Sequence, residues 1–141
     1  MGLALNMCNV YKYNKYEKAT KQLIKEHKIN VVMWRKPTKL LGGWSYINAK
    51  IVRSPYPRSN KSFAIFAHEV GHIANGKIRP ICLSEYKAEM FAREQFKRFG
   101  FNISKLDIAR QNRQICASLE LALKHGLKQI PSELIEYSNI G

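Results

Sequence analysis

The sequence predicts an α+β fold in which one helix is followed by a small sheet and then by further helices. Apolar residues recur at helical spacing before residue 28 and after residue 62. Residues 30–35 instead form a short segment rich in β-branched and aromatic residues, which is typical of a strand. Gly, Pro, Ser and Asn punctuate the chain between these segments. At 141 residues, 45% of them hydrophobic, the chain is long enough for one domain with its own core, residues 1–141.

The N-terminal part is expected to supply one helix. Residues 1–13 show no clear period and fit either a short arm or an edge strand. Asn14 can then cap a helix that runs to about His27, because its side chain can accept a hydrogen bond from a free backbone amide. The inward face of this helix is expected to carry Tyr16, Ala19, Leu23 and Ile24.

The strands of the sheet are expected next. Residues 30–35 form the first strand, and residues 36–43, which contain proline and paired glycine, connect it to the second. Residues 44–52 form one bent strand, or two strands joined at residues 48–50. Two prolines follow closely and end the sheet, because proline cannot donate a hydrogen bond to a strand ladder.

Helical spacing returns after the sheet. Ser59 or Ser62 can cap a helix that Gly76 ends. Its buried face is expected to carry Phe63, Phe66, Val70, Ile73 and Ala74. Ser84 can cap the next helix, over about residues 85–99, whose apolar stripe consists of Ala88, Phe91, Ala92, Phe96 and Phe99.

Residues 101–141 are expected to form a C-terminal helical extension. Ser104 and Asp107 resemble a capping box for a helix that runs to about Lys124. Its buried side is expected to carry Ala109, Cys116, Leu119, Ala122 and Leu123. Pro131 can open a last short helix over residues 132–137.

The helix after the sheet carries the residues with the clearest chemistry. His68 and His72 are four residues apart and therefore share one helix face, where two imidazoles can occupy two corners of a zinc tetrahedron. Glu69 would flank the ion and could act as a general base, as in the HExxH arrangement of metallopeptidases. The alternative is an amphipathic core helix with a solvated polar face. Burying three ionisable groups without a metal or partners would cost several kcal/mol, which favours the metal site.

A catalytic zinc site needs a third protein ligand. Glu85 and Glu89 are four residues apart and share a face with Ala88 and Ala92, so they should point toward the protein. We assign Glu85 as the ligand and Glu89 as the acceptor of the second N–H of a metal-bound imidazole. The reverse assignment stays open, as does a simple pairing of both carboxylates with nearby Lys or Arg on an exposed face.

The sequence from His68 to His72, followed by Glu85, Ala88, Glu89 and the Phe-Ala pair at residues 91–92, resembles the glutamate-zincin pattern. More closely, it resembles the compact ImmA/IrrE-type metallopeptidases of phages, conjugative elements and bacterial stress-response loci. The similarity covers roughly residues 14–100. Two departures are the short gap before Glu85 and a lysine at position 87, where an acidic residue is common.

The resemblance implies a zincin-like core in which a small twisted sheet of three or four strands packs on the HExxH helix. It implies His68, His72 and Glu85 as zinc ligands and Glu69 as the catalytic base. It also implies an edge strand within residues 44–53 that docks an extended substrate by strand addition. Members of this family often act on a DNA-binding repressor, so a DNA-binding regulator is an expected substrate.

The net charge and the cysteine content indicate which partners the protein can bind and in which compartment it is expected. The net charge of +14 favours acidic partners, nucleic acid included, although a merely soluble basic surface would also explain it. Three widely spaced cysteines, at positions 8, 82 and 116, form neither a metal motif nor a disulfide framework. Since no signal peptide or spanning segment is recognisable either, a cytoplasmic protein of a bacterial or phage-infected cell is expected.

The function expected from these features is that of a zinc-dependent endopeptidase, regulatory and of phage or mobile-element origin. The alternative is a basic zinc-containing binding or anti-defence protein that contacts nucleic acid or a protein without cleaving it. A DNA-associated protease of the SprT-like kind fits less well, because no third histidine follows His72 before His125. The group that would stabilise the oxyanion stays open among His125, Tyr46 and Tyr137.

Overall fold

The computed structural model describes residues 14–36 and 42–139 of the chain. The expectations for residues 1–13 and Cys8, and part of the predicted connector, lie outside these ranges. The described elements are α2 (Lys15–Glu26), β1 (Val31–Arg35), β2 (Trp44–Tyr46), β3 (Ile51–Pro55), α3 (Asn60–Asn75), α4 (Ile81–Phe99), α5 (Lys105–Lys124) and the 3₁₀ helix η1 (Ser132–Asn139). The predicted α+β class is confirmed.

The sheet has three strands in the order β1-β3-β2. β1 runs parallel to β3, with Val32 opposite Val52, and β2 runs antiparallel to β3, with Ser45 opposite the same valine. Residues 44–52 therefore form two strands rather than one bent strand. Because β3 is central, the edge strand predicted within residues 44–53 is β2, which pairs with β3 alone among the described residues.

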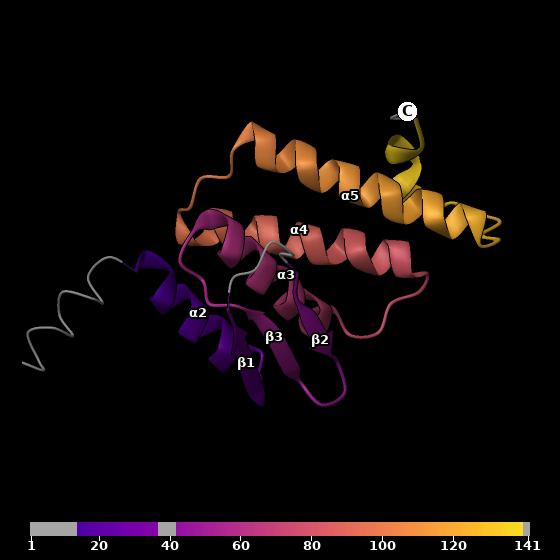
Figure 1. Cartoon of the computed structure of the whole chain (residues 1–141). Coiled ribbons are helices and arrows are strands. Elements are labelled where there is room, and N and C mark those ends of the chain that lie inside the picture. Colours follow the sequence, from indigo (N-terminus) through magenta and orange to yellow (C-terminus); the bar gives the residue numbers. More distant parts are fainter. Residues whose placement is uncertain (1–13, 37–41, 140–141) are drawn as a thin grey trace, which may run out of the picture.

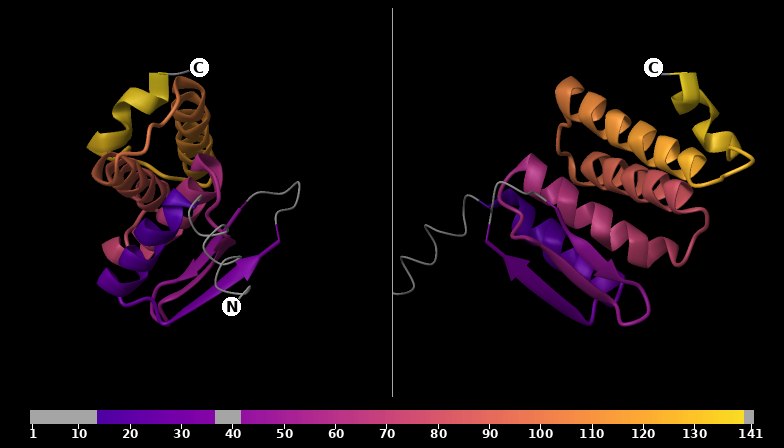
Figure 2. Two further views of the ribbon diagram at one scale, coloured as in Figure 1. Left: turned by 90° about the vertical axis from the view of Figure 1, so that its left-hand side faces the viewer. Right: turned by 45° about the vertical axis from the view of Figure 1, so that its right-hand side comes forward.

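The elements are stacked in layers (Figures 1 and 2). One face of the sheet packs on α3, α4 lies beside α3, and α5 lies beyond α4 with η1 against its C-terminal half. The main core lies between the sheet, α2, α3 and α4 and is rich in aromatic rings; its fully buried residues include Val52, Phe63, Phe66 and Val70. A second core joins α4, α5 and η1; it contains Cys82, Ile115, Cys116, Leu119, Leu134 and Tyr137.

The caps of α2 and α3 follow the sequence closely. The Asn14 side chain accepts from the amide of Tyr16, and buried Tyr16 stacks on Phe63 at a ring distance of 5.7 Å. Ser59 caps α3 and forms a capping box with Ser62, so both predicted serines take part. The four largest predicted apolar residues of α3 are buried, whereas Ala74 is exposed.

Two expectations for the later helices need correction. α4 begins at Ile81 and not after Ser84, because Pro80 takes the cap position and its carbonyl accepts from the amides of Leu83 and Ser84. In α5, Gln111 and Ile115 are buried, whereas Ala109 and Leu123 are exposed. The apolar pattern of α5 does not predict its buried residues correctly, because only a narrow stripe of this helix packs on α4 and η1. None of the described helices combines the length and apolar character that crossing a membrane requires.

An ion pair between Glu26 and Arg98 joins the end of α2 to the end of α4. Hydrogen bonds from Arg98 and Gln22 lower the pKa of Glu26 from the usual 4.5 to about 2. Because the carboxyl pKa is depressed in the folded protein, the pair stabilises the fold fully above pH 4.5, and this contribution is lost as the pH falls toward 2. We predict that Arg98→Ala returns the pKa of Glu26 toward 4.5.

An NMR titration of the Glu26 carboxyl carbon would measure this change. Arg113→Ala, on the exposed face of α5, removes a similar charge without touching Glu26 and serves as the control. A Glu26 pKa that is the same in wild type and Arg98→Ala would contradict the assignment.

Candidate metal centre

The close approach of α3 to α4 places the ionisable residues of the two helices side by side. At Gly71, a Cβ atom would lie 3.1 Å from the carbonyl oxygen of Ala88 and from Cβ of Phe91. Such a contact is tighter than an ordinary van der Waals contact, so a larger residue would push the two helices apart. Gly71 follows Glu69 by two residues and precedes His72, and it therefore sets the distance between the histidines of α3 and the carboxylates of α4.

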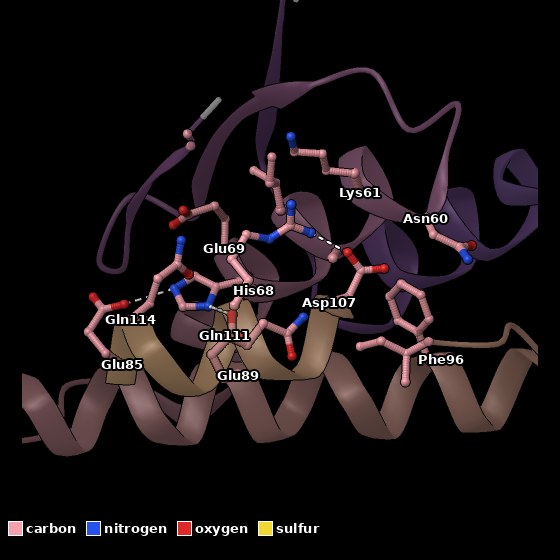
Figure 3. Close-up of a pocket in the computed structure, with 16 residues that line it drawn as sticks. Asn60, Lys61, His68, Glu69, Glu85, Glu89, Phe96, Asp107, Gln111 and Gln114 are labelled. Carbon is pink, nitrogen blue, oxygen red and sulfur yellow. Dashed lines mark hydrogen bonds and ion pairs between the residues drawn. The ribbon is translucent and has the colours of Figure 1, made fainter. Parts of the chain in front are cut away.

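The potential ligand atoms of His68, His72 and Glu85 all lie within 4.8 Å of one another. Figure 3 shows His68 of this group between Glu85 and Glu89. His68 Nε2 lies 2.9 Å from Glu85 Oε2, and His72 Nε2 lies 3.3 Å from Glu85 Oε1. The two Nε2 atoms are 3.2 Å apart. The carboxylate of Glu85 thus faces the same ring nitrogen of both imidazoles.

These distances suit a tetrahedral metal ion. Two ligands bound to zinc at about 2.0–2.1 Å lie about 3.3–3.4 Å apart, which is the edge of the tetrahedron. The two Nε2 atoms, 3.2 Å apart, are close to that edge, and each lies near a different oxygen of Glu85, at 2.9 and 3.3 Å. Two imidazoles and one carboxylate are also a donor set found in catalytic zinc sites. The cluster could therefore hold a metal ion with small adjustments of its side chains.

The second nitrogen of each imidazole also has a partner. His68 Nδ1 lies 2.6 Å from Glu89 Oε1, and His72 Nδ1 lies 3.1 Å from the hydroxyl of Ser84. Both partners come from α4. Such contacts orient an imidazole and select its tautomer, which leaves Nε2 available for a metal. Glu89 reaches His68 alone, whereas Glu85 reaches both histidines, so the geometry favours Glu85 as the ligand over the reverse assignment.

Burial and mutual charge shift the pKa values of the cluster. Burial lowers the pKa of His68, but hydrogen bonds to Glu85 and Glu89 more than offset it and raise the pKa to about 10. Burial also raises the pKa of Glu85, and its hydrogen bonds with His68 and His72 reverse this and hold the pKa well below its usual range. In the absence of metal the cluster is therefore an ion pair between imidazolium and carboxylate, and a metal would have to displace its proton.

Glu69 lies apart from the three converging residues but on the same cleft. The residue is 8% exposed, and burial raises the pKa of its carboxyl above the usual value, although the nearby histidines and a hydrogen bond with Ser45 act in the opposite direction. Its Cγ packs against Gly43, where an added Cβ would come within 2.8 Å of it. Gly43 and Ser45, at the start of β2, thus hold the carboxylate in place.

The cleft beside these residues has a volume of about 550 Å³. Gly42 and Gly43 form one wall, the α3 face with His68 and Glu69 forms the floor, and α5 forms the opposite wall. The lining residues of α5 are Asp107, Arg110, Gln111 and Gln114. The C-terminal extension, which the resemblance does not cover, is therefore part of the candidate site.

Sequence reasoning missed several residues of this site. The sequence predicts Ser84 as a helix cap, and only Pro80, a residue common at helix starts, indicates an earlier start of α4. Gly43 and Ser45 carried no signal beyond their place in a connector and a strand. Of the three residues considered for oxyanion stabilisation, none is among the described residues that line the cleft, and Tyr137 is buried in the second core.

Comparison with protein-family models, with curated proteins and with solved structures gave no significant match. The fold and the site therefore define the protein as an α+β protein with a candidate metal centre of two histidines and one glutamate. The metal, the roles of the residues and the resemblance to ImmA/IrrE-type metallopeptidases stay predictions.

We predict that the two partners of the imidazole Nδ1 atoms contribute to metal affinity. Glu89→Ala should weaken zinc binding by about 10- to 100-fold, because His68 loses the group that orients its ring. Ser84→Ala should have a smaller effect, since a neutral hydroxyl is a weaker acceptor than a carboxylate. Zinc affinity can be measured by competition with a chromogenic chelator.

Glu94→Ala is the matched control for this measurement, because Glu94 is an exposed glutamate of the same helix. Equal zinc affinities for Glu89→Ala and Glu94→Ala would show that Glu89 does not support the metal centre.

Proposed function

We propose that this protein is a zinc-dependent endopeptidase. The observation that carries the proposal is the convergence of His68, His72 and Glu85, whose potential ligand atoms lie within 4.8 Å of one another, beside a cleft that also holds Glu69. Three ligands leave a fourth position open, as in catalytic zinc sites, whereas structural zinc sites usually have four protein ligands. The cleft would give a substrate access to that position.

The residues of the chain would divide the chemistry among them. His68, His72 and Glu85 would hold the ion, which when bound supplies a Lewis acid and lowers the pKa of water. Glu69 would accept a proton from the attacking water and pass it to the leaving amine. Its raised pKa, caused by burial, brings the carboxyl nearer to the range in which it can both accept and donate a proton.

Hydrogen-bond donors on α5 can stabilise the negative charge that develops on the carbonyl oxygen. Gln111 and Gln114 line the wall opposite β2 and carry side-chain amides. Arg110 lines the same wall and is held by an ion pair with Asp107. These residues replace His125, Tyr46 and Tyr137 as candidates, because they border the cleft.

The arrangement of the sheet supports a zincin-like reading of the core. The sheet packs on the helix that carries the two histidines, and β2, an edge strand, begins directly after two glycines of the cleft wall. An extended peptide could pair with the outer edge of β2, which has no partner strand among the described residues, and pass along the cleft. A cytoplasmic, regulatory enzyme of phage or mobile-element origin that acts on a protein such as a DNA-binding regulator follows from the resemblance.

The competing proposal is a zinc-containing binding protein without proteolysis. Such a protein would need His68, His72 and Glu85 but would gain nothing from Glu69, whose burial has an energetic cost. Gly43 and Ser45 position that carboxylate beside the cleft. This positioning favours an enzyme over a binding protein.

We predict that Glu69→Gln retains zinc and loses peptidase activity by at least about 100-fold, because a neutral amide cannot act as a general base. The zinc-loaded protein would be incubated with a peptide library, and new termini would be counted by mass spectrometry. Glu85→Ala should instead lose zinc, which metal analysis would measure. Glu94→Gln is the control for a neutralised glutamate. Full activity in Glu69→Gln, or no metal-dependent termini from wild type, would refute the proposal.

Gly43→Ala provides a second test of the position of Glu69. The added Cβ would come within 2.8 Å of Glu69 Cγ and of the Arg53 carbonyl oxygen, so the Glu69 side chain or the strand must shift. We expect zinc content to be kept and kcat to fall about tenfold or more, because a displacement of about 1 Å can lower the rate by about 100-fold. Gly42→Ala is the control, because a Cβ there meets nothing within 4 Å. Wild-type kcat in a folded Gly43→Ala protein would contradict this role of Gly43.

A further inference from the structure

The acidic residues of the chain are distributed unevenly. Residues 27–68 contain no Asp or Glu but eight Lys or Arg. This stretch includes the whole sheet and the first half of α3. Seven of the eight cations lie in the described residues: Lys28, Arg35, Lys36, Lys50, Arg53, Arg58 and Lys61. The positive charge of the protein is therefore least compensated around the sheet.

A basic hollow lies where β1 and β3 end and α3 begins. Its volume is about 630 Å³, and Lys36, Arg58 and Lys61 line it together with the rings of Trp34 and Tyr56. In the described part of the chain, none of these three cations makes an ion pair. Lys61 also lines the metal-centre cleft, so the hollow and the cleft are neighbours.

Exposed aromatic rings lie on both faces of the sheet near the hollow. Trp34 is 40% exposed and lies on the α3 side, where its ring is 5.5 Å from that of Phe66 and meets Tyr56 edge to face at 5.1 Å. Trp44 is 52% exposed, and the guanidinium groups of Arg35 and Arg53 lie 5.7 and 5.3 Å from its ring centre. Trp44 and Arg53 lie on the face that points away from α3, and Arg35, which lines the hollow and also contacts Trp44, joins the two sites around the ends of β1 and β3.

We propose that this surface, the basic hollow together with Trp44 and Arg53, binds single-stranded nucleic acid. Proteins bind single strands by combining a basic groove, which follows the phosphates, with aromatic rings on which bases stack. Both components are present here, in the hollow and on the adjoining outer face of the sheet. A duplex would keep its bases stacked on one another and make no use of the exposed indole rings.

The chemistry of the surface distinguishes nucleic acid from an acidic polypeptide. Glutamate and aspartate side chains can pair with Lys36, Arg53 and Arg58 but have no ring to stack on Trp44. A nucleotide supplies a phosphate and a flat base at once. The pairing of arginine with indole therefore fits a nucleotide strand better.

The two tryptophans of the chain, Trp34 and Trp44, both belong to this surface, so its occupancy can be followed directly. Adding oligothymidylate of about 12 nucleotides, within the usual site sizes for such proteins, should quench tryptophan fluorescence because thymine stacks on indole. The dissociation constant should rise steeply with salt, since each phosphate contact releases counterions. Trp44→Phe should reduce the quenching while the protein still binds.

The location of the nucleic-acid binding surface is tested with two double variants that each remove two positive charges. Lys36→Ala/Arg58→Ala removes two cations of the surface, and Arg113→Ala/Lys124→Ala removes two exposed cations of α5, on the far side of the molecule. Loss of two phosphate contacts should lower the slope of log K against log salt by about 1.4 and weaken binding about tenfold or more. The α5 variant should resemble wild type in both measurements.

Three results would overturn the proposal. These are no quenching of wild type at physiological salt, an equal loss of affinity in the two double variants, or polyglutamate binding that is as strong as oligothymidylate binding and equally sensitive to Lys36→Ala/Arg58→Ala. The quenching of wild type does not depend on how any variant folds. Zinc content and peptidase activity are measured separately. The nucleic-acid proposal can therefore fail while the metal-centre proposal holds, and the metal-centre proposal can fail while the nucleic-acid proposal holds.

Discussion

The candidate centre depends above all on the packing of α3 against α4 at Gly71. Without a side chain at this position, the two helices approach until the histidines of one meet the carboxylates of the other. Burying these ionisable groups is unfavourable by itself. The hydrogen bonds that Glu85 and Glu89 make with His68 offset that cost in the metal-free protein, and a bound cation would do so in their place.

The same arrangement gives the protein a marked separation of charge. Glu69, Glu85 and Glu89 gather around two histidines, while the sheet and the start of α3 carry cations without acidic residues nearby in the sequence. A cation would be drawn to the first region and a polyanion to the second. Lys61 lines both the cleft beside the candidate metal centre and the basic hollow, so the two regions meet at this residue.

The C-terminal helices contribute more than stability. α5 is held on α4 by the second core and by hydrogen bonds from Arg93 to Gln111 and Asn112. This attachment turns Gln111 and Gln114 toward the cleft and narrows it from the side opposite β2. A segment with no interpretable chemistry in its sequence thus shapes the surroundings of the candidate metal centre.

The sequence alone determined what depends on local geometry: the α+β order, the capped ends of α2, α3 and α5, and the placing of His68 and His72 on one face of a helix. These features follow from contacts between residues a few positions apart. Only the tertiary structure decided which carboxylate faces both imidazoles, that Ser84 contacts His72 rather than capping a helix, and that Gly43 and Ser45 position Glu69. Those outcomes depend on how closely separate elements pack, which no local spacing encodes.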